Sequence, residues 1–392
     1  MQAAESDDDH LVHSAFGPPL TGVQLGASIG VGLVSLLLAG LISLLFGTLV
    51  TEHRMSQSGI GLCAASEALI MALTTGLFSA VVPTKRLKLL GVIGSVLLGT
   101  IDAATMAAHG NGVMLLRAAA GVPEGILLWI TIGMIARTAT PERWAAILFT
   151  GSTITQVIAA GLLTAFLLPR FGANGGFGLL AAAGVFGVAF SLFLPDEFAS
   201  LPKGEGEGGA PPPRGWLALA GILMFAAAAA AVGVYLLPLA EQHGLSPNAA
   251  NATVTLGLAA QIAGGALATL IAGRVRYIAV FFVGAAAFLV SWLVFGLHTP
   301  GWMLIAAMVV NGIVILLVPP FFVPMTIEVD ASRRTAVQSG AVQLLAAAVG
   351  PGLAGVIVGD HNINGVLWLS GGMLLFGLVL SSVLHFTATH DA

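Results

Sequence analysis

The chain has 392 residues, of which 57% are hydrophobic and only 8% are charged. A water-soluble globular protein carries roughly a quarter charged residues, so this composition excludes a fold whose whole surface faces water. The formal net charge is −4, and most of the 14 basic residues are scattered over loops, which suits lipid headgroups better than nucleic acid.

The chain begins with a short polar segment. Residues 1–21 carry an acidic run, Glu5 to Asp9, and no lysine or arginine. A secretory signal peptide would begin with a basic region. We therefore expect these residues to form a cytoplasmic N-terminal tail.

Twelve apolar segments follow the tail, and each has the roughly 20 residues that an α-helix needs to cross a bilayer. They span residues 22–50, 57–82, 88–108, 112–136, 144–168, 175–195, 216–240, 247–272, 277–297, 301–326, 335–358 and 363–386. The sequence therefore predicts an all-α integral membrane protein with 12 transmembrane helices.

One long polar stretch separates the sixth apolar segment from the seventh. Residues 196–215 contain a Gly-Glu repeat and a run of three prolines, a composition typical of a flexible linker. The linker divides the chain into an N-terminal six-helix bundle (22–195) and a C-terminal six-helix bundle (216–386). A cytoplasmic C-terminal tail follows (387–392).

The basic residues predict the orientation. Eleven of the 14 fall in alternate loops: Lys85, Arg86, Lys88, Arg137, Arg143, Lys203, Arg214, Arg274, Arg276, Arg333 and Arg334. The opposite loops carry only Arg54 and Arg170. By the positive-inside rule the first set of loops faces the cytoplasm. We therefore expect a multi-pass protein of the cell inner membrane with both termini cytoplasmic.

The two bundles show an internal repeat. Four landmarks recur at an offset of 190 residues: His53 and His243, Arg86 and Arg276, Arg143 and Arg333, and the turns at Asn111 and Gly301. Duplicated halves with a shared site near the midplane are the build of many secondary transporters. The repeat predicts two pseudo-symmetric bundles.

Over essentially its whole length the chain resembles the major facilitator superfamily. The resemblance rests on the six plus six helices, the central linker, basic loops after helices two and eight, and Arg117-x-x-x-Gly121 in helix four. It implies transport by alternating access, with a cavity between helices 1, 4, 7 and 10. It also implies a transporter and not an enzyme.

Four ionisable residues lie well inside predicted spans: Glu67, Asp102, Arg117 and Glu124. Each costs roughly 2.5–3.5 kcal/mol at a helix centre on insertion scales, so each needs a partner or a function. Asp102 and Arg117 both lie about 10 Å below the same end of adjacent antiparallel helices, which predicts an ion pair. Glu67 and Glu124 lie nearer the midplane, with no basic residue at their own depth.

The predicted fourth helix carries an arginine, a glycine and a glutamate on one face. Arg117 and Glu124 are seven residues apart and share one face with Gly121, and Pro123 favours a kink. The stretch resembles the helix-four pattern of proton-coupled organic-anion symporters, which implies that Arg117 takes part in substrate binding. A carboxylate in a low-dielectric medium favours its protonated form. We therefore interpret Glu124, Glu67 and Asp102 as proton-coupling candidates.

The C-terminal bundle lacks such charges. At the 190-residue offset the counterparts of the four ionisable residues are Gly257, Trp292, Ala307 and Val314. We expect this bundle to offer a neutral surface to the substrate. The candidate residues are Tyr235, Gln261, Asn311, Phe321, Phe322 and Gln343. Packing between helices is the alternative role for each of them.

These features predict a secondary active transporter that imports a small organic anion with protons. One alternative is proton-driven efflux of amphipathic compounds, and another is a membrane-embedded enzyme or a permease subunit served by a separate ATPase. The sequence has no Gly-x-Ser-x-Gly motif, no phosphate-binding Gly-Lys loop and no two histidines at positions i and i+4. We therefore expect no catalytic residues, cofactor or metal. The expected partners are the solute, protons and membrane lipid, not nucleic acid, and the chain is expected to act as a monomer.

Overall fold

The computed structural model describes residues 11–12, 20–138, 141–197, 211–297, 299–330, 334–358 and 363–388. Most of the predicted tails and of the predicted linker lies outside these residues, as do Lys203 and Arg333.

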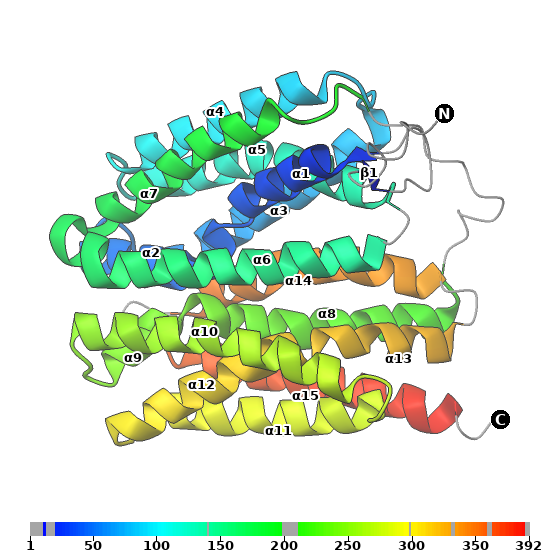
Figure 1. Ribbon diagram of the computed structural model, residues 1–392. Coiled ribbons are helices and arrows are strands. Elements are labelled where there is room, and N and C mark those ends of the chain that lie inside the picture. The colour runs from blue at the N-terminus through cyan, green and yellow to red at the C-terminus, as the bar shows by residue number, and fades with distance from the viewer. Residues whose placement is uncertain are drawn as a thin grey trace, which may run out of the picture.

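The described chain is helical apart from a two-stranded antiparallel sheet, β1 (Leu11–Val12) with β2 (Leu20–Thr21). The N-terminal bundle, here called the N-half, contains α1 (Gly22–Ser35), α2 (Ile42–Thr51), α3 (Gln57–Val81), α4 (Leu87–Thr105), α5 (Asn111–Ile135), α6 (Pro141–Leu162) and α7 (Leu168–Ser191). The C-terminal bundle, here called the C-half, contains α8 (Pro213–Val234), α9 (Leu236–Gln242), α10 (Pro247–Ile271), α11 (Tyr277–Gly296), α12 (Gly301–Leu317), α13 (Phe322–Val329), α14 (Arg334–Ile357) and α15 (Gly365–Ala388). Figure 1 shows the halves stacked on each other, with α6 and α14 where they meet.

The described chain contains 11 helical segments long and apolar enough to cross a membrane. One of them, Trp144–Ser191, has 48 residues and would be about 72 Å long as a straight helix, more than twice the hydrocarbon thickness. This segment folds back at Gly172, whose φ of 56° and ψ of −148° are open only to glycine. It therefore makes two crossings, which confirms the twelve that the sequence predicts.

The helix bounds confirm the internal repeat. α3 covers residues 57–81 and α10 covers 247–271, so both ends lie 190 residues apart. α4 and α11 begin at 87 and 277, and α5 and α12 begin at 111 and 301. Three corresponding helices therefore start at equivalent points in the two halves, which supports the pseudo-symmetric architecture.

Three of the predicted continuous spans are in fact broken. The first divides into α1 and α2, with a 3-10 turn between them at Leu38–Gly40. The seventh breaks at Tyr235, between α8 and α9, and the tenth breaks at Pro319–Phe321, between α12 and α13. Hydropathy did not reveal the breaks because the segments around them are apolar, although Pro319 and Pro320 are helix-breaking residues that mark the third break. Irregular backbone at membrane depth is tolerated where it is buried in protein or lines a cavity.

The two halves are joined closely at one end of the bundle, where α2 and α9 lie. The Leu237 N–H donates to Ser43 Oγ (2.7 Å), and the Gly61 N–H donates to the Tyr235 hydroxyl (3.1 Å). Gly61 on α3 also lies against α14, where an added Cβ would overlap the Pro351 carbonyl. The described hydrogen bonds between the halves therefore gather at this end.

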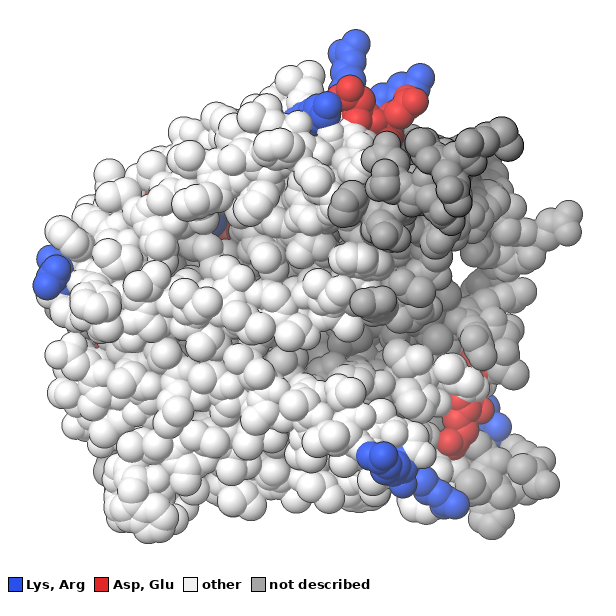
Figure 2. All heavy atoms as spheres, in the orientation of Figure 1, with Lys and Arg blue, Asp and Glu red and all other residues white. Residues whose placement is uncertain are grey.

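The sides of the molecule are apolar. Figure 2 shows the lysines, arginines, aspartates and glutamates of the visible face near the ends of the helices, with almost none along the sides. Large apolar side chains such as Phe186, Val290 and Trp368 are exposed on the helices. An outer surface of this kind faces lipid, which agrees with a multi-pass membrane protein.

Candidate functional site

A cluster of four ionisable side chains lies inside the N-half, with Arg117 of α5 at its centre. Its Nη1 donates to Asp102 Oδ1 (2.6 Å) on α4. Its Nη2 donates to Glu67 Oε1 (2.5 Å) on α3, and its Nε donates to the same oxygen (3.2 Å). The predicted ion pair between Asp102 and Arg117 is therefore confirmed.

The prediction that Glu67 and Glu124 lack a basic partner is wrong. Glu67 accepts three hydrogen bonds from the guanidinium, and Glu124 Oε1 lies 3.9 Å from Arg117 Nη2. The number of residues to the nearest loop gives the depth of a Cα atom in a straight helix. The charge of Arg117 lies several ångströms from its own Cα, so its guanidinium reaches Glu67 and Glu124 at a different depth.

Two glycines explain why the cluster can form. On α5, a Cβ added at Gly121 would lie 2.5 Å from the Glu67 carbonyl oxygen, and one at Gly125 would lie 2.6 Å from the Met71 carbonyl oxygen. This Gly-x-x-x-Gly spacing lets the backbones of α5 and α3 approach closely. The approach brings Arg117 and Glu124 to the level of Glu67.

The cluster is closed to solvent. Arg117 is 0% exposed, and the three carboxylic residues are at most 4% exposed. The Phe177 ring of α7 covers the guanidinium, with 5.7 Å from Cζ to the ring centroid. Three carboxylates against one guanidinium would leave two uncompensated negative charges in a dry interior, which is very costly. A buried cluster with more carboxyl groups than cations is less costly when the excess carboxyl groups are protonated.

A separate cavity of about 470 Å³ lies between the two halves. Its lining is mostly apolar, and the described lining residues include no charged side chain. The expectation that helices 1, 4, 7 and 10 surround it is only partly correct. The first, seventh and tenth helices contribute, but the fourth helix, α5, contributes no described lining residue. The wall on that side is α3, through Ala64, Ala68 and Met71, because α5 packs behind α3.

Of the candidate substrate residues, Gln261 and Phe322 line the cavity. The others lie outside the described lining. The Tyr235 hydroxyl accepts from Gly61, Asn311 Oδ1 accepts from Trp292 Nε1 (3.0 Å), and Gln343 Nε2 donates to the Ser339 carbonyl (3.4 Å). Phe321 is buried, and Arg117 lies in the charge cluster.

Sequence reasoning missed four polar lining residues: Ser43, Ser152, Thr153 and Gln156. Gln156 of α6 donates to the Leu36 carbonyl (2.7 Å), which the break between α1 and α2 leaves without its helical partner. No pattern in the sequence marked that break, so nothing indicated that a buried amide would be needed beside it.

The C-half has a neutral link where the N-half has the charge cluster. Trp292 of α11 is the repeat counterpart of Asp102, and its Nε1 donates to Asn311 of α12. In both halves a side-chain hydrogen bond therefore joins the third and fourth helices, but only the N-half link is ionic. Among the described residues, no group of three or more His, Cys, Asp or Glu has the arrangement of a metal site.

A family model described as the Major Facilitator Superfamily matches residues 27–344. Among solved structures, the nucleoside transporter NupG is similar with a TM-score of 0.71 and 13% identity, over 93% of this chain and 98% of that one. A bacterial homologue of the human lysosomal transporter Spinster, inward-facing and occupied, is similar with a TM-score of 0.65 and 12% identity, over 93% and 96%. At these identities the likeness establishes the fold. No curated protein matches the sequence.

Proposed function

Because this chain belongs to the major facilitator superfamily and has the fold of its secondary transporters, we propose that it couples the movement of a small organic solute to protons. The observation that carries the proposal is the cluster of three buried carboxyl groups, those of Glu67, Asp102 and Glu124, around the single guanidinium of Arg117. Buried carboxyl groups that outnumber their cation can release and rebind a proton when their surroundings change.

Helix α3 provides the mechanical link in this proposal. Glu67 points into the charge cluster, while Ala68, the next residue along, lines the cavity. The same helix packs on α14 of the other half at Gly61. A change of protonation at Glu67 or Glu124 alters how α3 lies against α5. Because α3 also forms part of the cavity and of the contact between the halves, the change reaches both.

The cavity favours an uncharged or amphipathic solute over the organic anion that the helix-four pattern indicated. An anion needs a cation in the cavity, and Arg117 was the candidate. Its guanidinium is fully buried and hydrogen-bonded to Glu67 and Asp102. The described lining residues offer no other cation. The alternative of transporting amphipathic compounds therefore has the stronger support.

We further propose that the protein lies in the inner membrane with both termini cytoplasmic, so that the end where α2 and α9 join the two halves faces the periplasm. Lys85 lies just before α4 and Asn111 begins α5, at the other end of α4, and both are exposed. Cys63 is the sole cysteine. In a Cys63→Ser background, an impermeant maleimide added to intact cells should label Asn111→Cys and not Lys85→Cys. Labelling of position 85 alone would reverse the orientation.

Proteoliposomes containing a pH-sensitive dye test the coupling. Carboxylates, sugars, amino acids and amphipathic drugs are added in turn, and both solute uptake and internal pH are followed. A transported solute should change the internal pH, and an imposed pH gradient should drive its accumulation. Solute flux that leaves the pH unchanged and ignores the gradient would contradict proton coupling.

A further inference from the structure

One polar side chain of the described cavity lining, that of Gln261, makes no hydrogen bond to a described residue. Ser43 accepts from the Leu237 N–H, Thr153 donates to the Phe149 carbonyl, and Gln156 donates to both the Leu36 carbonyl and Ser152. Gln261 of α10 also lines the cavity, and its amide makes no hydrogen bond to a described residue. An amide carries two donors and a carbonyl acceptor, and in an apolar cavity these are available to a solute.

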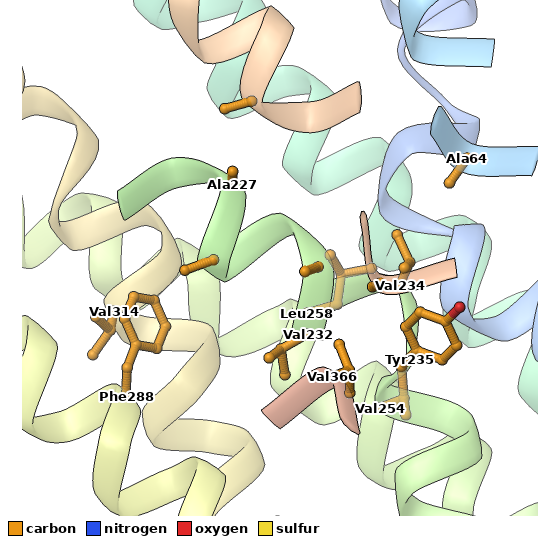
Figure 3. Packing of buried hydrophobic residues seen from close by; sticks show 14 of the residues in the cluster. Ala64, Ala227, Val232, Val234, Tyr235, Val254, Leu258, Phe288, Val314 and Val366 are labelled. Atoms are coloured by element: carbon orange, nitrogen blue, oxygen red, sulfur yellow. The ribbon is translucent and has the colours of Figure 1, made fainter. Parts of the chain in front are cut away.

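Three aromatic rings form a wall of the same cavity. Phe225 of α8 lies 6.2 Å from Phe288 of α11 and 6.0 Å from Phe322 of α13, measured between ring centroids. All three line the cavity, and Figure 3 shows Phe288 beside Val314, another lining residue. The three residues are at most 2% exposed, so only a small part of each ring reaches the cavity, where it can make an edge contact with a further aromatic ring. Like Gln261, they all belong to the C-half.

We propose that the cavity binds an uncharged aromatic solute, whose ring packs on the Phe225–Phe288–Phe322 wall and whose amide or carbonyl edge hydrogen-bonds the Gln261 side chain. This inference rests on the proposed transport function, because it names the solute class of the same cavity. An anionic or cationic solute loses its hydration shell on entry and finds no opposite charge among the described lining residues. Gln261 is therefore the residue that sets specificity for the polar edge.

Four probes with one ring system test the proposal: naphthalene, naphthalene-2-carboxamide, naphthalene-2-carboxylate and 2-naphthylmethylammonium. Binding is measured by calorimetry on the purified protein in nanodiscs, with empty nanodiscs subtracted and no pH gradient. The carboxamide should bind at least about tenfold more tightly than either charged probe, because burying an unpaired charge is costly. Gln261→Leu should weaken carboxamide binding by about tenfold, the effect of one lost hydrogen bond, and leave naphthalene binding unchanged.

Gln343→Leu is the matched control, since it removes the same amide from a position on α14 outside the described lining. It should change neither affinity. Naphthalene binding shows that each variant retains a folded cavity. The proposal is overturned if the carboxamide does not bind the native protein, if a charged probe binds as tightly, or if Gln261→Leu leaves the carboxamide affinity unchanged or weakens both neutral probes equally. Binding is measured without a pH gradient, so it does not depend on proton coupling. If the probe affinities are as expected but no proton coupling is found, only the proposed coupling is overturned.

Discussion

Replacing Arg117 with glutamine is expected to destabilise the protein by about 3–5 kcal/mol, the usual cost of removing one partner from a buried ionic network. The variant leaves Glu67, Asp102 and Glu124 buried without their shared cation. These carboxyl groups must then be protonated in the folded state. Because the folded variant binds more protons than the unfolded chain, its stability should fall as pH rises. Thermal unfolding in detergent between pH 5 and 8 measures both effects.

Two further variants separate a lost charge network from general damage. Arg54→Gln removes another buried arginine, which donates mainly to carbonyl oxygens at the end of α4 and to Asn174. Its loss strands no buried carboxylate, so its stability should not acquire the same pH dependence. A triple variant, Arg117→Gln with Glu67→Gln and Asp102→Asn, should recover much of the lost stability because it removes the unpaired charges. An Arg117→Gln variant that is as stable as the native protein at every pH and still transports would refute both a structural and a functional role for the arginine.

Glu124→Gln is expected to abolish proton-driven accumulation and to preserve exchange of solute. Glu124 has the longest contact with Arg117, 3.9 Å, so it depends least on the guanidinium and can change protonation most freely. Glutamine keeps the size and hydrogen bonding of the side chain but cannot ionise. A pH difference of one unit sustains about a tenfold solute ratio for each coupled proton. In proteoliposomes the native protein should approach that ratio for one proton, and the variant should fall to about one.

Counterflow exchange of solute in the same vesicles shows whether the variant still binds the solute and still changes access from one side of the membrane to the other. Glu67→Gln should give a milder defect, because Arg117 retains Asp102 and Glu124 as partners. Asp196→Asn is the control for loss of a carboxylate elsewhere. Asp196 is largely exposed, and its ion pair with Lys88 is long, at 3.9 Å. Undiminished pH-driven accumulation by Glu124→Gln would assign the coupling role to Glu67 or Asp102.

The helices and their repeat could be predicted because hydropathy and loop composition are properties of consecutive residues and need no knowledge of contacts between helices. The pairing of Asp102 with Arg117 was predictable for a related reason, since their depths follow from counting residues to the nearest loop. The contacts of Glu67 were not, because they depend on how closely α5 approaches α3 and on the reach of one side chain. The break beside Leu36 was equally hidden, because the apolar residues there suit a continuous helix. The cavity lining follows from such breaks and approaches, so sequence located only Gln261 and Phe322 in it.

The absence of charged side chains from the described cavity lining has an electrical consequence. With an uncharged solute, as proposed, each transport cycle moves only the charge of its coupled protons across the membrane. The membrane voltage then acts on transport together with the pH difference, and 100 mV contributes about 2.3 kcal/mol for each elementary charge that crosses. The protein would therefore generate a current, and the ratio of that current to the solute flux would give the number of protons that accompany each solute molecule.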